Sequence, residues 1–127
     1  MSFMLKIRWD IKGGREADFR ANQEKLCTVM TEHPGVICYH ADYPSEQVSQ
    51  WTEIYATNES FKAHLANEKG KEPLGTLIDA CDKITCQCWG NPDDESKEIL
   101  AGFGATYHET EENAFVLNSG ADKDSLI

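Results

Sequence analysis

The chain has 127 residues, of which 40% are hydrophobic and 27% charged, as is typical of one soluble globular domain with its own core. Twelve basic against 22 acidic residues give a net charge of −10, which repels phosphate groups and argues against nucleic-acid and anionic membrane partners. No apolar run approaches the roughly 18 residues of a membrane-spanning helix.

The first third of the chain predicts a strand followed by a helix. Side chains alternate over residues 3–9, so one face of a half-buried strand carries Phe3, Leu5, Ile7 and Trp9. Charged residues at positions 6, 8 and 10 interrupt any signal-peptide segment, and we expect a cytoplasmic protein. Pro34-Gly35 ends a helix that starts near residue 15, and its apolar stripe contains Phe19, Leu26, Val29 and Met30.

Three more strands are predicted over residues 36–43, 51–56 and 83–89, because apolar and polar side chains alternate there. Between the last two, Thr57 or Asn58 can cap a helix that Gly70 ends, and Pro73 can start a second helix. The element order is therefore β-α-β-β-α-β with the second helix broken in two. This is the ferredoxin-like split βαβ arrangement of an α+β protein.

The chain divides into a ferredoxin-like domain over 1–90 and a C-terminal extension over 91–127. The extension is expected to contain a short helix, two short strands at 105–108 and 114–117, and a mobile tail. It can cover the mouth of a pocket or reach across a dimer. Its candidates for closing a pocket are Tyr107 and His108.

One face of the predicted sheet is covered by the helices, and the other is expected to carry aromatic and apolar groups such as Trp51 and Tyr55. An open apolar sheet face requires a partner, and a second copy of the chain supplies one. We therefore predict a homodimer that packs sheet to sheet into an α/β barrel.

The five cysteines are an odd number, and without a secretory signal they are expected to be free thiols. Cys86 and Cys88 resemble half of a metal site, but the second pair of ligands that zinc requires is missing. Residues that are two apart on a strand also share one face of the sheet. We therefore expect these cysteines to be small buried residues and not a metal site.

The segment EIYATNESFKAH joins the third strand to the next helix, and it contains Glu53, Tyr55, Phe61 and His64. This spacing resembles the antibiotic biosynthesis monooxygenase-like family of dimeric α+β barrels. The family pattern is a strand with Glu-x-aromatic, a short turn, and a helix with an apolar residue three positions before a histidine. The resemblance covers about residues 1–90 and implies a dimeric barrel with a small-molecule cavity.

The junction residues predict an acid–base site. His64 can act as the general base because the ordinary pKa of histidine is about 6.5, and Glu53 can orient it or bind a substrate hydroxyl. A histidine on the flank of an amphipathic helix can equally be a partly exposed or structurally hydrogen-bonded group. Alternatively, Glu53 is a buried structural residue, and its partner can be Arg8 in an ion pair, His64, a tyrosine hydroxyl or water. Arg8 can otherwise hold an anionic group. The remaining pocket candidates are Tyr55, Trp51, Tyr39 and His40, which can also be core, interface or interior structural residues.

The resemblance implies a cofactor-independent monooxygenase that acts on a small aromatic, quinol-like or polyketide-like compound in the barrel cavity. In that chemistry the substrate supplies the electrons, so no cofactor is expected. Two alternatives stay open: a non-catalytic small-molecule-binding or stress-associated barrel, and an isomerase-type enzyme that uses the same base without O₂.

Overall fold

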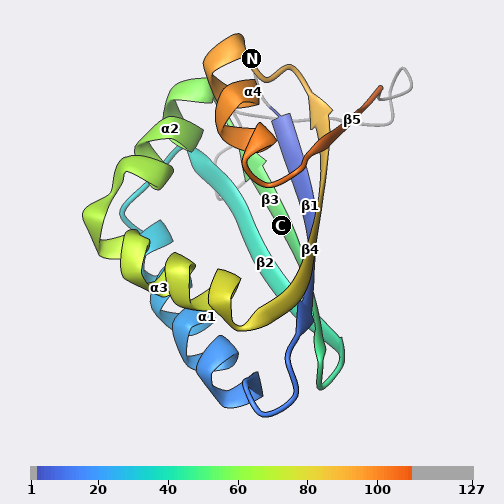
Figure 1. Cartoon of the computed structure of the whole chain (residues 1–127). Helices are drawn as coiled ribbons and strands as arrows, with labels where there is room; N and C mark the ends of the chain where they lie inside the picture. Colours follow the sequence, from blue (N-terminus) through green and yellow to red (C-terminus); the bar gives the residue numbers. More distant parts are fainter. Residues whose placement is uncertain (1–2, 110–127) are drawn as a thin grey trace, which may run out of the picture.

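The computed structural model describes residues 3–109, which form one sheet with helices packed on one side of it (Figure 1). In chain order the elements are β1 (Phe3–Ile11), α1 (Glu16–Met30), β2 (Val36–Ser45), β3 (Val48–Tyr55), α2 (Asn58–Ala66), α3 (Glu68–Asp79), β4 (Cys81–Gly90), α4 (Asp94–Ala101) and β5 (Thr106–His108). None of the helices in this part of the chain is long and apolar enough to cross a membrane.

The strands are ordered β2-β3-β1-β4-β5 across the sheet. The first four pair antiparallel, whereas β5 runs parallel to β4 and forms one edge. Since β1 lies between β3 and β4, the two halves of the chain meet at the centre of the sheet, as in the ferredoxin-like arrangement. The predicted α+β, ferredoxin-like fold is confirmed, including the division of the second helix into α2 and α3.

Strand alternation decides which side chains of the sheet face the helices. In β1 the odd-numbered residues are buried, whereas Lys6 and Arg8 are exposed. The register between β1 and β3 places Trp51, Glu53 and Tyr55 on the same buried face. Each large apolar side chain buried there stabilises the fold by about 1.5–3 kcal/mol. The helices close this face with Phe19, Leu26, Phe61 and Leu77.

The buried positions of Trp51 and Tyr55 correct the prediction that they lie on an open sheet face. Their exposed fractions are 2% and 0%, because the register with β1 turns them towards the helices. The open face carries the alternate residues of each strand, which are mainly polar. One of its rows is more apolar, and its cross-strand neighbours are Cys38, Ile54, Met4 and Trp89. The aromatic surface that suggested a dimer is therefore part of the core, and the dimer stays a prediction.

The structure moves the break between α2 and α3 from the predicted Gly70 to Asn67. Asn67 has an extended backbone with ψ of 117°, and its side chain caps α3 by accepting from the Lys69 N–H at 3.0 Å. Gly70 lies inside α3 and faces α1, where a Cβ would approach Leu26 Cδ1 to 3.3 Å. This glycine allows two helices to pack closely and does not end one of them.

The beginning of the C-terminal extension packs back on the domain through α4. Asp93 caps α4 by accepting from the Ser96 N–H at 2.8 Å, and Lys62 of α2 pairs with Asp93 at 2.8 Å. Asn58 of α2 accepts from the Asp93 N–H at 2.9 Å and from the Ser96 hydroxyl at 2.8 Å. These contacts hold α4 against α2. The first predicted strand of the extension is β5, and the second, at 114–117, lies outside the described residues.

Candidate active site

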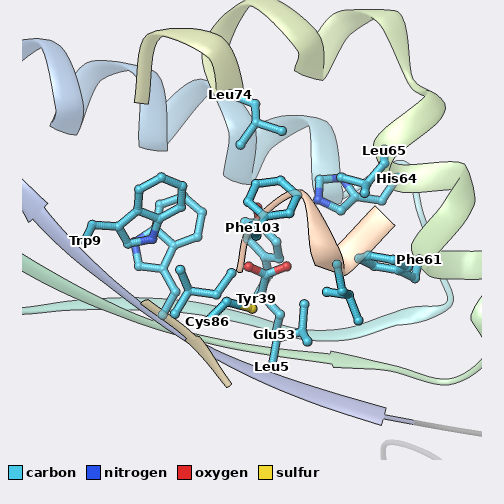
Figure 2. Close-up of a pocket in the computed structure, with 13 residues that line it drawn as sticks. Leu5, Trp9, Tyr39, Glu53, Phe61, His64, Leu65, Leu74, Cys86 and Phe103 are labelled. Atoms are coloured by element: carbon cyan, nitrogen blue, oxygen red, sulfur yellow. The ribbon is translucent and has the colours of Figure 1, made fainter. Parts of the chain in front are cut away.

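A small cavity lies between the inner face of the sheet and the helices (Figure 2). Its volume is about 30 Å³, which is room for about two water molecules. Glu53 lies between Trp9 on one side and His64 on the other (Figure 2). Tyr39 and Cys86 add further polar groups, and the apolar wall includes Leu5, Leu65, Leu74, Leu100 and Phe103.

Glu53 is a carboxyl group buried at the centre of the sheet. It lies opposite Leu5 of β1 and Tyr39 of β2, and its exposed fraction is 4%. Burial raises the pKa of Glu53 to about 7, because the charged form loses its hydration, and a hydrogen bond from Tyr55 opposes part of that rise. Tyr55, two residues along β3, donates its hydroxyl proton to Glu53 Oε1. Near neutral pH this carboxyl group can both accept and release a proton.

His64 lies on the sheet-facing side of α2, one turn after Phe61. Its ring lies nearly parallel to that of Tyr55, at 16° and 6.1 Å between centroids, and edge-on to that of Tyr39 at 5.6 Å. Burial, and secondarily the nearby His33, lowers the pKa of His64 to about 4. His64 is therefore neutral at physiological pH. Its Nδ1 atom is buried without a hydrogen-bond partner among residues 3–109.

Two tryptophans form one end of the cavity and differ in their indole N–H groups. The ring centroids of Trp9 and Trp51 are 5.0 Å apart. Trp51 donates its N–H to the Ser49 hydroxyl at 2.8 Å. In the described part of the chain, the buried Nε1 of Trp9 has no hydrogen-bond partner. Tyr39 lies edge-on to Trp51 at 5.4 Å, and burial, followed by the charge of Glu53, raises its pKa well above the ordinary value, so it keeps its proton.

The structure brings some of the predicted site residues together and separates others. The predicted residues that line the cavity are Trp51, Tyr39, Glu53 and His64. Tyr55 is not part of the lining, but it donates a hydrogen bond to Glu53. Arg8 and His40 are outside this cavity, because strand alternation places both on the opposite sheet face.

Of the partners considered for Glu53, the structure has the tyrosine hydroxyl and not Arg8 or His64. Arg8 pairs with Asp10 at 3.1 Å and not with Glu53, since the two side chains leave opposite faces of the sheet. Within residues 3–109 no hydrogen bond joins Glu53 to His64; Tyr55 is the group that donates to the carboxylate. Glu53 therefore does not orient the imidazole in this structure.

The residues predicted to close the pocket lie elsewhere. Tyr107 is 46% exposed and donates its hydroxyl to the Lys97 carbonyl at 3.4 Å. His108 stacks on Trp89 of the open face, with ring centroids 4.8 Å apart. Phe103, just after α4, takes the expected place at the cavity. Nothing in the local pattern distinguished Phe103 from Tyr107, because the direction of each depends on how α4 docks.

Trp9 and Cys86 are cavity residues that sequence reasoning did not select. A signal for Trp9 was present, since it shares the alternating face of Leu5, and that face proved to be the one that carries Glu53. Burial raises the pKa of Cys86 to about 12, so it is a neutral thiol. All five cysteines are free, as predicted. Among residues 3–109 no group of three or more histidine, cysteine or acidic side chains is placed to hold a metal ion.

The chain is similar to MupZ from Pseudomonas fluorescens, with a TM-score of 0.73 and 15% identity over 95% of this chain and 98% of that one. It is also similar to a proposed antibiotic biosynthesis monooxygenase from Caulobacter crescentus, with a TM-score of 0.64 and 14% identity over 72% and 91% of the two chains. A variant of SnoaB, a cofactor-independent oxygenase from Streptomyces nogalater, has a TM-score of 0.61 and 11% identity over 72% and 94%. No protein-family model and no curated protein matches the sequence.

These comparisons confirm the antibiotic biosynthesis monooxygenase-like fold that the junction between β3 and α2 predicted. At identities of 11–15% the likeness defines the fold alone. The similarity to MupZ covers 95% of this chain, against 72% for each of the other two.

Proposed function

We propose that this protein is a cofactor-independent monooxygenase in which Glu53 is the proton acceptor for a small aromatic or enolisable substrate. The observation that carries the proposal is a carboxyl group, buried in an apolar cavity and hydrogen-bonded by Tyr55, with its pKa raised to about 7. Such a group accepts a proton from a weakly acidic substrate at neutral pH and is shielded from bulk water.

The reaction requires no electrons from the protein. Glu53 takes a proton from a CH₂ group next to a carbonyl or phenol, and the resulting carbanion or enolate donates electrons to O₂. The carbon of the peroxide adduct then loses its second hydrogen as the O–O bond breaks, so CH₂ becomes C=O. The outer oxygen of the peroxide leaves as hydroxide. The proton held by Glu53 converts this hydroxide into water. Tyr39 keeps its hydroxyl proton and can donate to the oxyanion as it forms.

Glu53 is a stronger base in this setting than the predicted base, His64. A base with a pKa of about 4 holds a proton far less well than one with a pKa of about 7. We therefore assign His64 a binding role through its unpartnered Nδ1, with Tyr55 stabilising the ionised carboxylate.

Substrate entry requires part of the wall to move, because the cavity has room for only about two water molecules. The half-buried members of the wall, which lie nearest to solvent, are Tyr39, Leu65, Leu74 and Phe103. Phe103 is flanked by Gly102 and by Gly104, which has a positive φ of 66°. We propose that this glycine-flanked phenylalanine moves aside to admit the substrate.

The proposal also includes a cytoplasmic homodimer. The open sheet face is the surface for it, because the row Met4, Ile54 and Cys38 provides apolar contacts there. The wider polarity of this face indicates a modest interface and not a second core.

The test is oxygen uptake by purified, metal-free protein with a panel of quinols, catechols and anthrone-like phenols. Glu53→Gln keeps the shape and removes the base, so turnover is expected to fall by a factor of about 100 or more. Glu59→Gln, on the exposed side of α2, is the matched control and should keep full turnover. Equal rates in Glu53→Gln and the native protein would show that Glu53 is not the base.

An isomerase-type reaction is the second candidate, because the Glu53–Tyr55 pair suffices to move a proton without O₂. Deuterium exchange into a panel compound under argon distinguishes the two. Exchange that depends on Glu53, without oxygen uptake in air, favours the isomerase. Ligand binding with neither exchange nor uptake favours a non-catalytic binding protein.

A further inference from the structure

The indole N–H of Trp9 is a donor that the fold buries and leaves unpaired. Trp9 is 1% exposed, and among the residues that the structure describes its Nε1 atom has no hydrogen-bond partner. Its ring neighbours are Phe19 at 5.6 Å and Trp51 at 5.0 Å. Burying a donor without an acceptor destabilises a fold, so such a group in a cavity wall indicates a ligand that accepts from it.

A second unpaired polar atom lies at the other side of the same cavity. His64 is 4% exposed, and its Nδ1 also has no hydrogen-bond partner within residues 3–109. The carboxyl group of Glu53 lies between the two (Figure 2). The cavity therefore presents the Trp9 N–H at one side, the Glu53 carboxyl group in the middle and the His64 imidazole at the other side, with apolar side chains around them.

The charges in the wall set a further limit. No lysine or arginine is among the described residues that line the cavity, and the Arg8 side chain lies on the opposite face of the sheet. An anionic ligand would lose its hydration beside the Glu53 carboxyl group without gaining a cation. The wall thus favours an uncharged ligand.

We propose that Trp9 determines specificity by donating its indole N–H to an acceptor oxygen of an uncharged, oxygen-substituted aromatic ligand, whose hydroxyl group meets Glu53 and His64. This assignment rests on the proposed function for the location of the chemistry, but it concerns binding alone. Trp51 provides the internal contrast, since its N–H is already bonded to Ser49.

Three small phenols test the assignment by calorimetry in oxygen-free buffer at pH 7. 4-Methoxyphenol carries an acceptor oxygen where 4-ethylphenol carries a CH₂ group, and 4-hydroxybenzoate replaces the neutral substituent with a charged one. The native protein should favour 4-methoxyphenol over 4-ethylphenol by roughly fivefold more than Trp9→Phe does. The ratio is taken within each variant, so the smaller phenylalanine ring weakens the binding of both ligands alike and cancels. Trp51→Phe is the matched control and should keep the native ratio.

A second measurement uses the native protein and does not depend on the folding of a variant. In ¹H–¹⁵N spectra, 4-methoxyphenol should shift the Trp9 indole N–H resonance downfield, and 4-ethylphenol should not. Equal ratios in native protein and Trp9→Phe, or an unmoved indole resonance, would overturn the role of Trp9. Binding of 4-hydroxybenzoate as tight as that of 4-methoxyphenol would overturn the preference for an uncharged ligand, and binding of none of the three would overturn both.

The outcome is separable from the proposed reaction. Glu53→Gln should lose turnover and keep the preference for 4-methoxyphenol that Trp9 confers. If oxygen uptake and proton exchange are both absent in the native protein while this preference is present, the binding inference holds and the proposed function fails. If turnover is present without the preference, the proposed function holds and the binding inference fails.

Discussion

Glu53 and His64 share one cavity, and burial shifts their pKa values in opposite directions for the same reason. An apolar environment penalises the charged form of each group, so the acid holds its proton to higher pH and the base loses its proton at lower pH. Both groups are therefore neutral over much of the range between pH 4 and 7. The titratable groups that face them are Tyr55, Tyr39, Cys86 and His33.

Glu53 should make the protein less stable as pH rises. Its pKa is about 7 in the folded state against an ordinary 4.5, so the folded state binds the proton more tightly. The stability linked to that proton is complete below pH 4.5 and is lost between 4.5 and about 7, by roughly 3 kcal/mol. In urea unfolding from pH 4.5 to 8, the free energy of unfolding of Glu53→Gln should rise relative to that of the native protein by about that amount. That of Glu59→Gln should not change relative to the native protein. A difference that does not change with pH would contradict the buried carboxyl group.

His64 should act in the opposite sense. Its folded pKa is about 4 against an ordinary 6.5, so its contribution is complete above pH 6.5 and is lost as pH falls towards 4, by roughly 3 kcal/mol. In the same urea series, the free energy of unfolding of His64→Gln should therefore rise relative to that of the native protein as the pH falls. His33→Gln, which removes the secondary cause, should show only a small part of this effect. Parallel profiles for native protein and His64→Gln would mean that the imidazole is solvated.

At the scale of elements, α4 and the turn after it form one part of the cavity wall. It contributes Leu100 and leads directly to Phe103, and both line the cavity. Asn58 at the start of α2 holds α4, accepting from Asp93 and Ser96. With the ion pair between Lys62 and Asp93, these bonds make α4 part of the packed structure.

Removing the Asn58 amide should loosen α4 selectively. Asn58→Ala leaves the Ser96 hydroxyl, itself fully buried, without its acceptor, and should lower the free energy of unfolding by about 2 kcal/mol. Hydrogen exchange should rise in 94–101 more than in α1. Asn22→Ala, which removes an exposed bond to the Asp18 carbonyl, is the control and should change stability little. Uniform exchange over the whole chain would mean that α4 is not held by Asn58.

At the scale of the whole molecule, the open sheet face is the surface that we propose for a dimer. The helices cover the other face, and the row Met4, Ile54 and Cys38 is the apolar part of the open one. Trp51 and Tyr55, which were expected there, belong to the core instead. The proposed interface therefore consists of this row, with Trp89 beside it, and of the polar groups around it.

Sedimentation equilibrium should find the native chain dimeric at micromolar concentration and Ile54→Lys monomeric, since a buried unpaired charge opposes association. Gln50→Lys, on the same strand and face but in a polar row, is the control and should stay dimeric. A native chain that is monomeric throughout would remove the proposed dimer.

The sequence by itself determined the strands and helices and their order along the chain. Alternation gave the strands, the 3.6-residue period gave the helices, and the Glu-x-aromatic and histidine spacing of Glu53, Tyr55 and His64 pointed to the right fold. It also placed Glu53, Trp51, Tyr39 and His64 among the candidates that line one cavity. These features depend on residues near each other in the chain, so a linear pattern contains them.

Only the tertiary structure decided which face of the sheet the helices cover. Alternation defines two faces but does not say which is buried, so Arg8 and His40 were grouped with Glu53, and Trp9 was not. The same applies to the pKa values, because desolvation depends on what the rest of the chain places around a group. The choice of Glu53 over His64 as the base follows from burial, and burial is a property of the packed fold.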